Sequence, residues 1–166
     1  MENESFKECL VEHKGNGLFK FLQVLLITIT VIFALIGLVN ILFWILAVAS
    51  GVGAYFAGMN ANLEYEYLYM ERELQVDKIM NKSRRKKVAN YEVGRMEILA
   101  PFHSYHLDDF KNRQFDKVKD FSIGEELQPD RRYVLIYDGK EKIVLSPSED
   151  MVAMIKRDAP RKVFTD

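Results

Sequence analysis

Residues 21–63 read FLQVLLITITVIFALIGLVNILFWILAVASGVGAYFAGMNANL and contain no Asp, Glu, Lys or Arg. A single helix over residues 21–59 would be about 58 Å long at 1.5 Å per residue, whereas the hydrocarbon core of a bilayer is about 30 Å thick. Residues 37–40, Gly-Leu-Val-Asn, supply a turn, because Gly and Asn tolerate the backbone that closes a helical hairpin. We therefore predict two membrane spans, at residues 18–37 and 41–59.

Other readings of this apolar stretch fit less well. A cleaved signal peptide is suggested by Ala47-Val48-Ala49, which resembles a cleavage site. However, the apolar run from residue 21 to residue 46 exceeds the roughly 7–15 residues of a signal-peptide core. The segment before it also carries four acids, Glu2, Glu4, Glu8 and Glu12. One tilted helix does not absorb a near doubling of length, and a buried soluble helix is usually shorter and has a polar face.

Positive charges flank the predicted hairpin on one side only. They are Lys7, Lys14 and Lys20 before it, and Arg72, Lys78 and the basic run from Lys82 to Lys87 after it. The positive-inside rule then places both termini in the cytoplasm. We expect a multi-pass cell-membrane protein with three parts: a cytoplasmic segment (residues 1–17), a transmembrane hairpin (18–59) and a cytoplasmic domain (60–166).

Small residues form one face of the second span, namely Ala47, Gly51, Ala54 and Gly58. Such residues let helix backbones approach closely inside a membrane. Two uses stay open: packing of the hairpin on itself, and contact with another membrane protein or a second copy. The spans contain no ionisable group, and this favours an anchor over a pump or a channel.

The cytoplasmic part is expected to be an α+β domain. Leu63, Tyr65, Tyr67 and Tyr69 alternate with other residues at strand spacing. We predict strands at 63–70, 74–76, 87–93, 96–99, 118–121, 133–137 and 142–145, with Asp138-Gly139 as a hairpin turn. A helix capped by Ser146 follows and must end before Pro160. The strands form a small antiparallel sheet or barrel, and the C-terminal helix covers it.

Five positive charges fall within six residues, at Lys82, Arg84, Arg85, Lys86 and Lys87. Near an anionic leaflet each contributes about 1 kcal/mol of binding free energy. The run predicts a site for anionic lipid or an acidic protein partner; the alternative is a solvated loop that only sets orientation. Glu71, Glu73 and Asp77 lie nearby in sequence and would oppose lipid binding. The net charge of −1 and the lack of an RNA-binding aromatic motif argue against nucleic acid.

No catalytic residue, metal or cofactor is predicted. The single cysteine, Cys9, excludes a disulfide framework. We therefore expect a non-enzymatic, membrane-anchored interaction module, such as an accessory subunit. One alternative is a small metal-dependent enzyme that uses His103, His106 and Asp108, the only cluster with metal-ligand residue types. Another is a transporter or channel subunit that oligomerises through the small-residue face.

A resemblance supports this architecture. Two spans, a Tyr-rich strand leaving the membrane, a sheet and a closing helix resemble the bacterial PH-like membrane proteins over roughly residues 60–160. Leu74 and Tyr91-x-Val93-x-x-Met96-x-Ile98 match that family's second-strand Leu and its apolar turn. Three segments resemble small two-span proteins of unknown function from anaerobic Gram-positive bacteria: Glu64-Tyr65-Glu66-Tyr67-Leu68-Tyr69, Asp77-Lys78-Ile79-Met80-Asn81-Lys82-Ser83 and Ala159-Pro160-Arg161-Lys162-Val163-Phe164. The resemblance implies a PH-like domain and no activity. The family's turn Gly is absent, and Asn81-Lys82-Ser83 replaces it.

Overall fold

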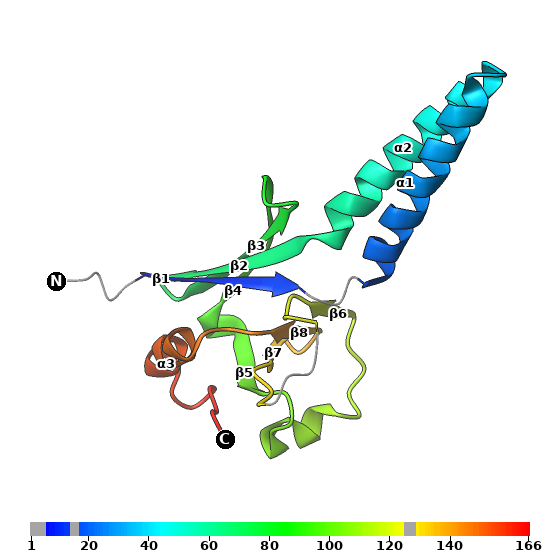
Figure 1. Ribbon diagram of the computed structural model, residues 1–166. Coiled ribbons are helices and arrows are strands. Elements are labelled where there is room, and N and C mark those ends of the chain that lie inside the picture. Colours follow the sequence, from blue (N-terminus) through cyan, green and yellow to red (C-terminus); the bar gives the residue numbers. More distant parts are fainter. Residues whose placement is uncertain (1–5, 14–16, 125–128) are drawn as a thin grey trace.

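The computed structural model describes residues 6–13, 17–124 and 129–166. Two apolar helices, α1 (Gly17–Gly37) and α2 (Leu42–Ala61), lie side by side and project away from two β-sheets (Figure 1). In the turn between them, Asn40 Oδ1 accepts a hydrogen bond from the Leu42 backbone N–H at 3.1 Å. The predicted helical hairpin is confirmed, and each helix end lies within two residues of its expected position.

The hairpin presents an apolar exterior. Both helices are long and apolar enough to cross a membrane. Large apolar side chains such as Leu18, Val24 and Ile45 are exposed along them. The small-residue face of α2 is turned toward α1: Gly51 lies closest to Thr30, and Gly58 closest to Gln23. A hydrogen bond of 2.9 Å from Thr30 Oγ1 to Ser50 Oγ also links the two helices.

The first sheet is antiparallel, with the strand order β1-β2-β3-β4. Its strands are β1 (Phe6–His13), β2 (Leu63–Met70), β3 (Glu73–Met80) and β4 (Arg84–Glu92). The turn between β2 and β3 is tight, because Glu71 and Arg72 both have positive φ angles. The strands expected at 63–70, 74–76 and 87–93 are present. Strand β3 begins one residue earlier and ends four residues later than predicted, and β4 begins three residues earlier.

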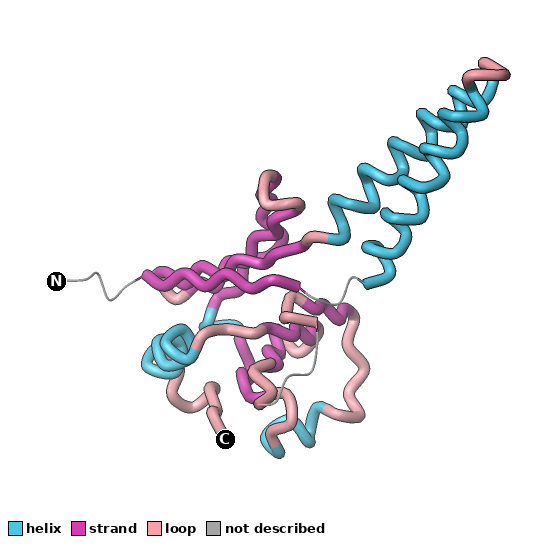
Figure 2. The backbone as a smooth tube through the Cα atoms, viewed as in Figure 1, coloured by secondary structure: helices cyan, strands magenta, loops and turns pink. Residues whose placement is uncertain are grey.

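Strand β1 was not expected from the sequence, which suggested only a segment preceding the membrane. β1 pairs with β2 along its whole length, so that Phe6 lies opposite Met70 and His13 opposite Leu63. The helical hairpin is thus inserted between two neighbouring strands of one sheet (Figure 2). The remaining residues of the N-terminal segment, 1–5 and 14–16 with Lys14, lie outside the described residues.

The second sheet contains β5 (Met96–Pro101), β6 (Lys117–Asp120), β7 (Tyr133–Tyr137) and β8 (Glu141–Leu145), in the order β5-β7-β8-β6. Positive φ angles at Asp138 and Gly139 confirm the predicted hairpin turn. The expectation of a purely antiparallel sheet is wrong at one edge, because β6 pairs with β8 in parallel. The long connection from β5, which includes a 3₁₀ helix (Tyr105–Phe110), allows this direction.

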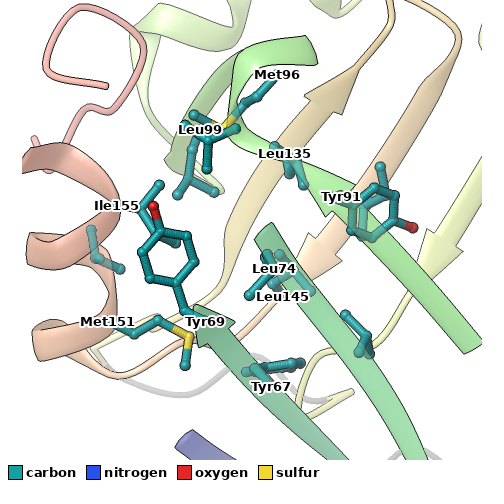
Figure 3. Packing of buried hydrophobic residues seen from close by; sticks show 14 of the residues in the cluster. Tyr67, Tyr69, Leu74, Tyr91, Met96, Leu99, Leu135, Leu145, Met151 and Ile155 are labelled. Carbon is teal, nitrogen blue, oxygen red and sulfur yellow. The ribbon is translucent and has the colours of Figure 1, made fainter. Parts of the chain in front are cut away.

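Helix α3 (Glu149–Asp158) closes the domain. Its N-cap is Ser148, whose side chain accepts a hydrogen bond from the Met151 backbone N–H; Ser146 instead accepts one from the Ile123 N–H. The predicted cap is therefore wrong by two residues, while the end before Pro160 is confirmed. The core lies between the sheets and α3 (Figure 3). It includes Tyr67, Tyr69, Leu74, Leu135, Met151 and Ile155. The α+β fold class is confirmed.

Candidate functional site

The five clustered basic residues lie at the turn between β3 and β4. We call Lys82, Arg84, Arg85, Lys86 and Lys87 the basic tip. All five are exposed, as expected for a binding surface or a solvated loop. However, the residues from Arg84 onward form a strand rather than a loop. Strand β3 continues to Met80, and its residues pair with those of β4 from Arg84 onward. The four residues 84–87 therefore have fixed backbone positions at the edge of the sheet.

A backbone hydrogen bond ties this turn to the end of the helical hairpin. The Asn81 N–H donates to the carbonyl oxygen of Asn62, the residue that follows α2, at 2.8 Å. Leu63 lies opposite Met80, which lies opposite Arg84. Two strand spacings separate Leu63 from Arg84, or about 10 Å. The turn also stands on the side of the sheet toward which the helices project (Figure 1). The basic tip therefore lies beside the base of the hairpin.

Two members of the basic tip have acidic partners on β2. Arg85 Nη2 lies 2.6 Å from the Glu66 carboxylate, and Lys82 Nζ lies 4.0 Å from Glu64. Within the described residues, the other three make no ion pair: Arg84, Lys86 and Lys87. Three cations are thus available to an external anion.

The acids that face the tip differ from those suggested by sequence proximity. Glu71 and Glu73 lie at the opposite end of β2 and β3, roughly 25 Å away by strand length. Their expected opposition to anion binding is therefore wrong. Asp77 does lie opposite Lys87. Cross-strand partners depend on register, which the local sequence does not specify, and so Glu64 and Glu66 were missed.

Glu66 is the most deeply buried carboxyl in the described part of the chain, with 3% of its surface exposed. Arg85 Nη2 lies 2.6 Å from its carboxylate and donates a hydrogen bond to Oε1. Burial raises the pKa of Glu66, and a hydrogen bond with the Glu8 side chain raises it further, although Arg85 opposes both effects. This carboxyl is therefore easier to protonate than an exposed one.

The histidine cluster does not converge. His103 Nε2 lies 3.2 Å from Asp130, and the His106 ring stacks on Phe164 with its Nε2 3.6 Å from Asp166. Asp108 pairs with Lys111 instead. Across residues 6–13, 17–124 and 129–166, the structure contains no group of three or more metal-ligating side chains. The alternative of a metal site at His103, His106 and Asp108 is not supported by this geometry.

An open groove of about 520 Å³ lies at the other end of β2 and β3. It is lined by the β2–β3 turn, by the segment around Gly94 and by the residues that follow α3. Two of its three cations are held by the protein's own backbone: Arg72 donates to the Asp158 carbonyl and Lys162 to that of Gly94. Its lining mixes four acids with three bases, and no chemistry follows from this mixture.

Two sheets closed by a C-terminal helix, with a basic turn beside the junction of the first two strands, define a PH-like domain that carries a helical hairpin. The family model for the bacterial PH-like domain (DUF6106) matches residues 3–165, and so the chain belongs to that family. The match includes β1 and the hairpin as well as the two sheets. No curated protein and no solved structure matches the chain. The PH-like resemblance is thereby confirmed, and the anaerobic Gram-positive origin stays a prediction.

Proposed function

We propose that this protein is a non-enzymatic interaction module anchored in the cell membrane. In this proposal α1 and α2 cross the bilayer and both termini are cytoplasmic. The PH-like domain then lies against the inner leaflet, where the basic tip binds anionic lipid headgroups. An accessory role toward a protein partner would use the same placement.

The observation that carries the proposal is the hydrogen bond between Asn81 and Asn62. It holds the β3–β4 turn against the residue at which the chain leaves α2. A helix that ends at a membrane surface would therefore keep the basic tip within reach of the headgroups. Each Lys or Arg near an anionic leaflet contributes about 1 kcal/mol. Tethering also raises the local concentration of the tip, so that weak contacts suffice.

Two observations disfavour the alternatives. The small-residue face of α2 packs on α1, with Ala47, Ala54 and Gly58 buried, and is therefore already occupied within the hairpin. This weakens the case for a transporter or channel subunit that assembles through that face. The separate partners of His103, His106 and Asp108 weaken the case for a metal-dependent enzyme.

Removing the three unpaired cations tests the lipid contact. Changing Arg84, Lys86 and Lys87 to Gln is expected to weaken binding of phosphatidylglycerol by at least tenfold, since three such charges contribute up to about 3 kcal/mol. The fold should persist, because all three side chains are exposed. Native mass spectrometry of the full chain in detergent, titrated with this lipid, measures the apparent Kd.

A matched variant controls for net charge. Changing Lys111, Arg113 and Lys140 to Gln removes the same charge from exposed positions around the β5–β6 connection and the β7–β8 turn, and should leave lipid binding unchanged. Phosphatidylcholine should bind neither better nor worse in either variant. Equal loss in both triple variants would show a general charge effect and would contradict a site at the tip.

A further inference from the structure

The outer face of the first sheet, on the side away from the core, carries a cluster of ionisable side chains from all four strands, of which Glu66 and Asp77 are buried. The ionisable groups around Glu66 on this face are Glu8 and Glu12 of β1, Glu64 of β2, Asp77 of β3, and Arg85 and Lys87 of β4. Asp77 is directly opposite Glu66 and is also buried; it accepts a hydrogen bond from Gln75 at 2.8 Å. Negative groups therefore outnumber positive ones around Glu66.

Arg85 reaches across this cluster. Its backbone pairs with Ile79 of β3, yet its guanidinium lies 2.6 Å from Glu66 on β2, one strand further along the sheet. The side chain is thus drawn over the sheet and away from the open edge of β4. It remains 55% exposed, and an external anion therefore has access to it. Glu66 and an external phosphate group would compete for the same guanidinium.

Resting on the proposed function, we infer that Glu66 is an internal competitor for Arg85, and that protonation of Glu66 frees Arg85 to bind an anionic headgroup. Arg85 is then held by the sheet when Glu66 is ionised and joins the basic tip when Glu66 is neutral. Binding of anionic lipid should strengthen as the pH falls. The other three cations, Arg84, Lys86 and Lys87, would supply a basal contact that does not depend on Glu66.

The direction of the expected pH dependence of lipid binding follows from the surroundings of Glu66. Burial and the neighbouring Glu8 raise its pKa, so its protonated form appears at a higher pH than for an exposed glutamate. Arg85 opposes this shift. When a headgroup takes Arg85 away, Glu66 loses that opposition and its pKa rises further. Lipid binding and proton uptake therefore favour each other, as linkage requires.

The test uses the full chain in nanodiscs and measures how close the basic tip lies to the lipid headgroups. A bimane fluorophore is attached at Ser83→Cys, with Cys9, the only cysteine, changed to Ala. Nanodiscs contain phosphatidylcholine with phosphatidylglycerol and a small amount of lipid with a nitroxide headgroup, which quenches bimane nearby. The measured quantity is the phosphatidylglycerol fraction needed for half-maximal quenching, from pH 8 to pH 5.

Glu66→Gln imitates the protonated state. At pH 8 it should lower the required phosphatidylglycerol fraction about fivefold, the worth of one added cation. Across this pH range, the phosphatidylglycerol fraction that Glu66→Gln requires should change less than the fraction that the wild type requires. At low pH the wild-type value should approach that of Glu66→Gln. Arg85→Gln should remove the pH-dependent increment, and the double variant should behave like Arg85→Gln. Thermal unfolding checks that each variant is folded, and Glu73→Gln, at the far end of the strands, should behave like the wild type.

The outcomes separate the two proposals. If quenching depends on phosphatidylglycerol but Glu66→Gln and the wild type share one pH profile, the competitor role is wrong and the lipid site stands. Should Arg85→Gln retain the full pH dependence of the wild type, the competitor role is also wrong. If quenching does not depend on the phosphatidylglycerol fraction in any variant, the lipid site itself is wrong, and the inference that rests on it is wrong as well.

Discussion

A chain in which residues 14–62 are replaced by Asn-Gly is expected to fold as a soluble domain, whereas a chain that starts at Leu63 is expected not to fold. The reason is the register of β1 and β2, in which His13 lies directly opposite Leu63. Two residues can join such a pair as a tight hairpin, and Asn-Gly favours the turn that this requires. The helical hairpin would then be dispensable for folding of the domain.

Strand β1, by contrast, is part of the domain. Val11 is buried in the core, and Cys9, opposite Tyr67, packs against it. Starting the chain at Leu63 removes these contacts and all eight β1–β2 residue pairs. It also turns β2, whose Tyr67 and Tyr69 are core residues, into an unprotected edge strand, and such edges promote aggregation.

Circular dichroism and a ¹H–¹⁵N correlation spectrum distinguish the two chains. The Asn-Gly chain should unfold cooperatively and show dispersed amide resonances. The chain from Leu63 should aggregate or lack a thermal transition. A stable, dispersed domain without residues 1–62 would mean that β1 is not required for the fold.

Tyr67→Phe is expected to lower the free energy of unfolding by about 3 kcal/mol, although it removes a single oxygen atom. The Tyr67 side chain is fully buried, and its hydroxyl donates to the Phe121 carbonyl at 2.5 Å and accepts from the Ser146 N–H at 3.2 Å. Burial raises the pKa of Tyr67, so the hydroxyl remains a neutral donor at working pH. Phe would leave the buried Phe121 carbonyl and the partly buried Ser146 N–H without that partner, at about 1–3 kcal/mol each.

Thermal unfolding of the two variants provides the measurement. For a domain of this size the expected loss corresponds to a decrease in Tm of roughly 10–20 °C. Tyr105→Phe is the matched control, because Tyr105 is 64% exposed and its hydroxyl makes only a 3.4 Å contact with Asp166. Its Tm should change by less than about 2 °C. Equal Tm values for the two variants would contradict the role assigned to the Tyr67 hydroxyl.

Local patterns were sufficient to predict much of this fold. The absence of charge over residues 21–63 predicted both apolar helices, residue alternation predicted β2, and the Asp138-Gly139 turn signal predicted the β7–β8 hairpin. Strand β1 was missed, because its partner lies beyond the whole helical hairpin. Its weak signal was the alternation of Cys9 and Val11, which face the core, with polar Glu8 and Glu12.

The candidate site was predicted only in part. The basic run was visible in the sequence, and its exposure matches the expectation. The position of the basic run beside Asn62 could not be predicted from the sequence, because this position depends on the paired lengths of β2 and β3. The contact between Arg85 and Glu66 spans three strands and follows a register shift between Val76 and Asp77. No local pattern specifies such a contact, because a shift of one residue would move either side chain to the other face of the sheet.

The central claim is that the hairpin holds the basic tip at an anionic membrane surface. The most direct measurement compares bimane quenching by nitroxide headgroups at two positions of the full chain: Ser83→Cys in the tip and Asn112→Cys in the β5–β6 connection, each with Cys9→Ala. In nanodiscs that contain phosphatidylglycerol, we predict strong quenching at position 83 and little at position 112. Higher salt should reduce the quenching at position 83 as the Debye length falls below about 10 Å. Equal quenching at the two positions, or none at position 83, would contradict the account.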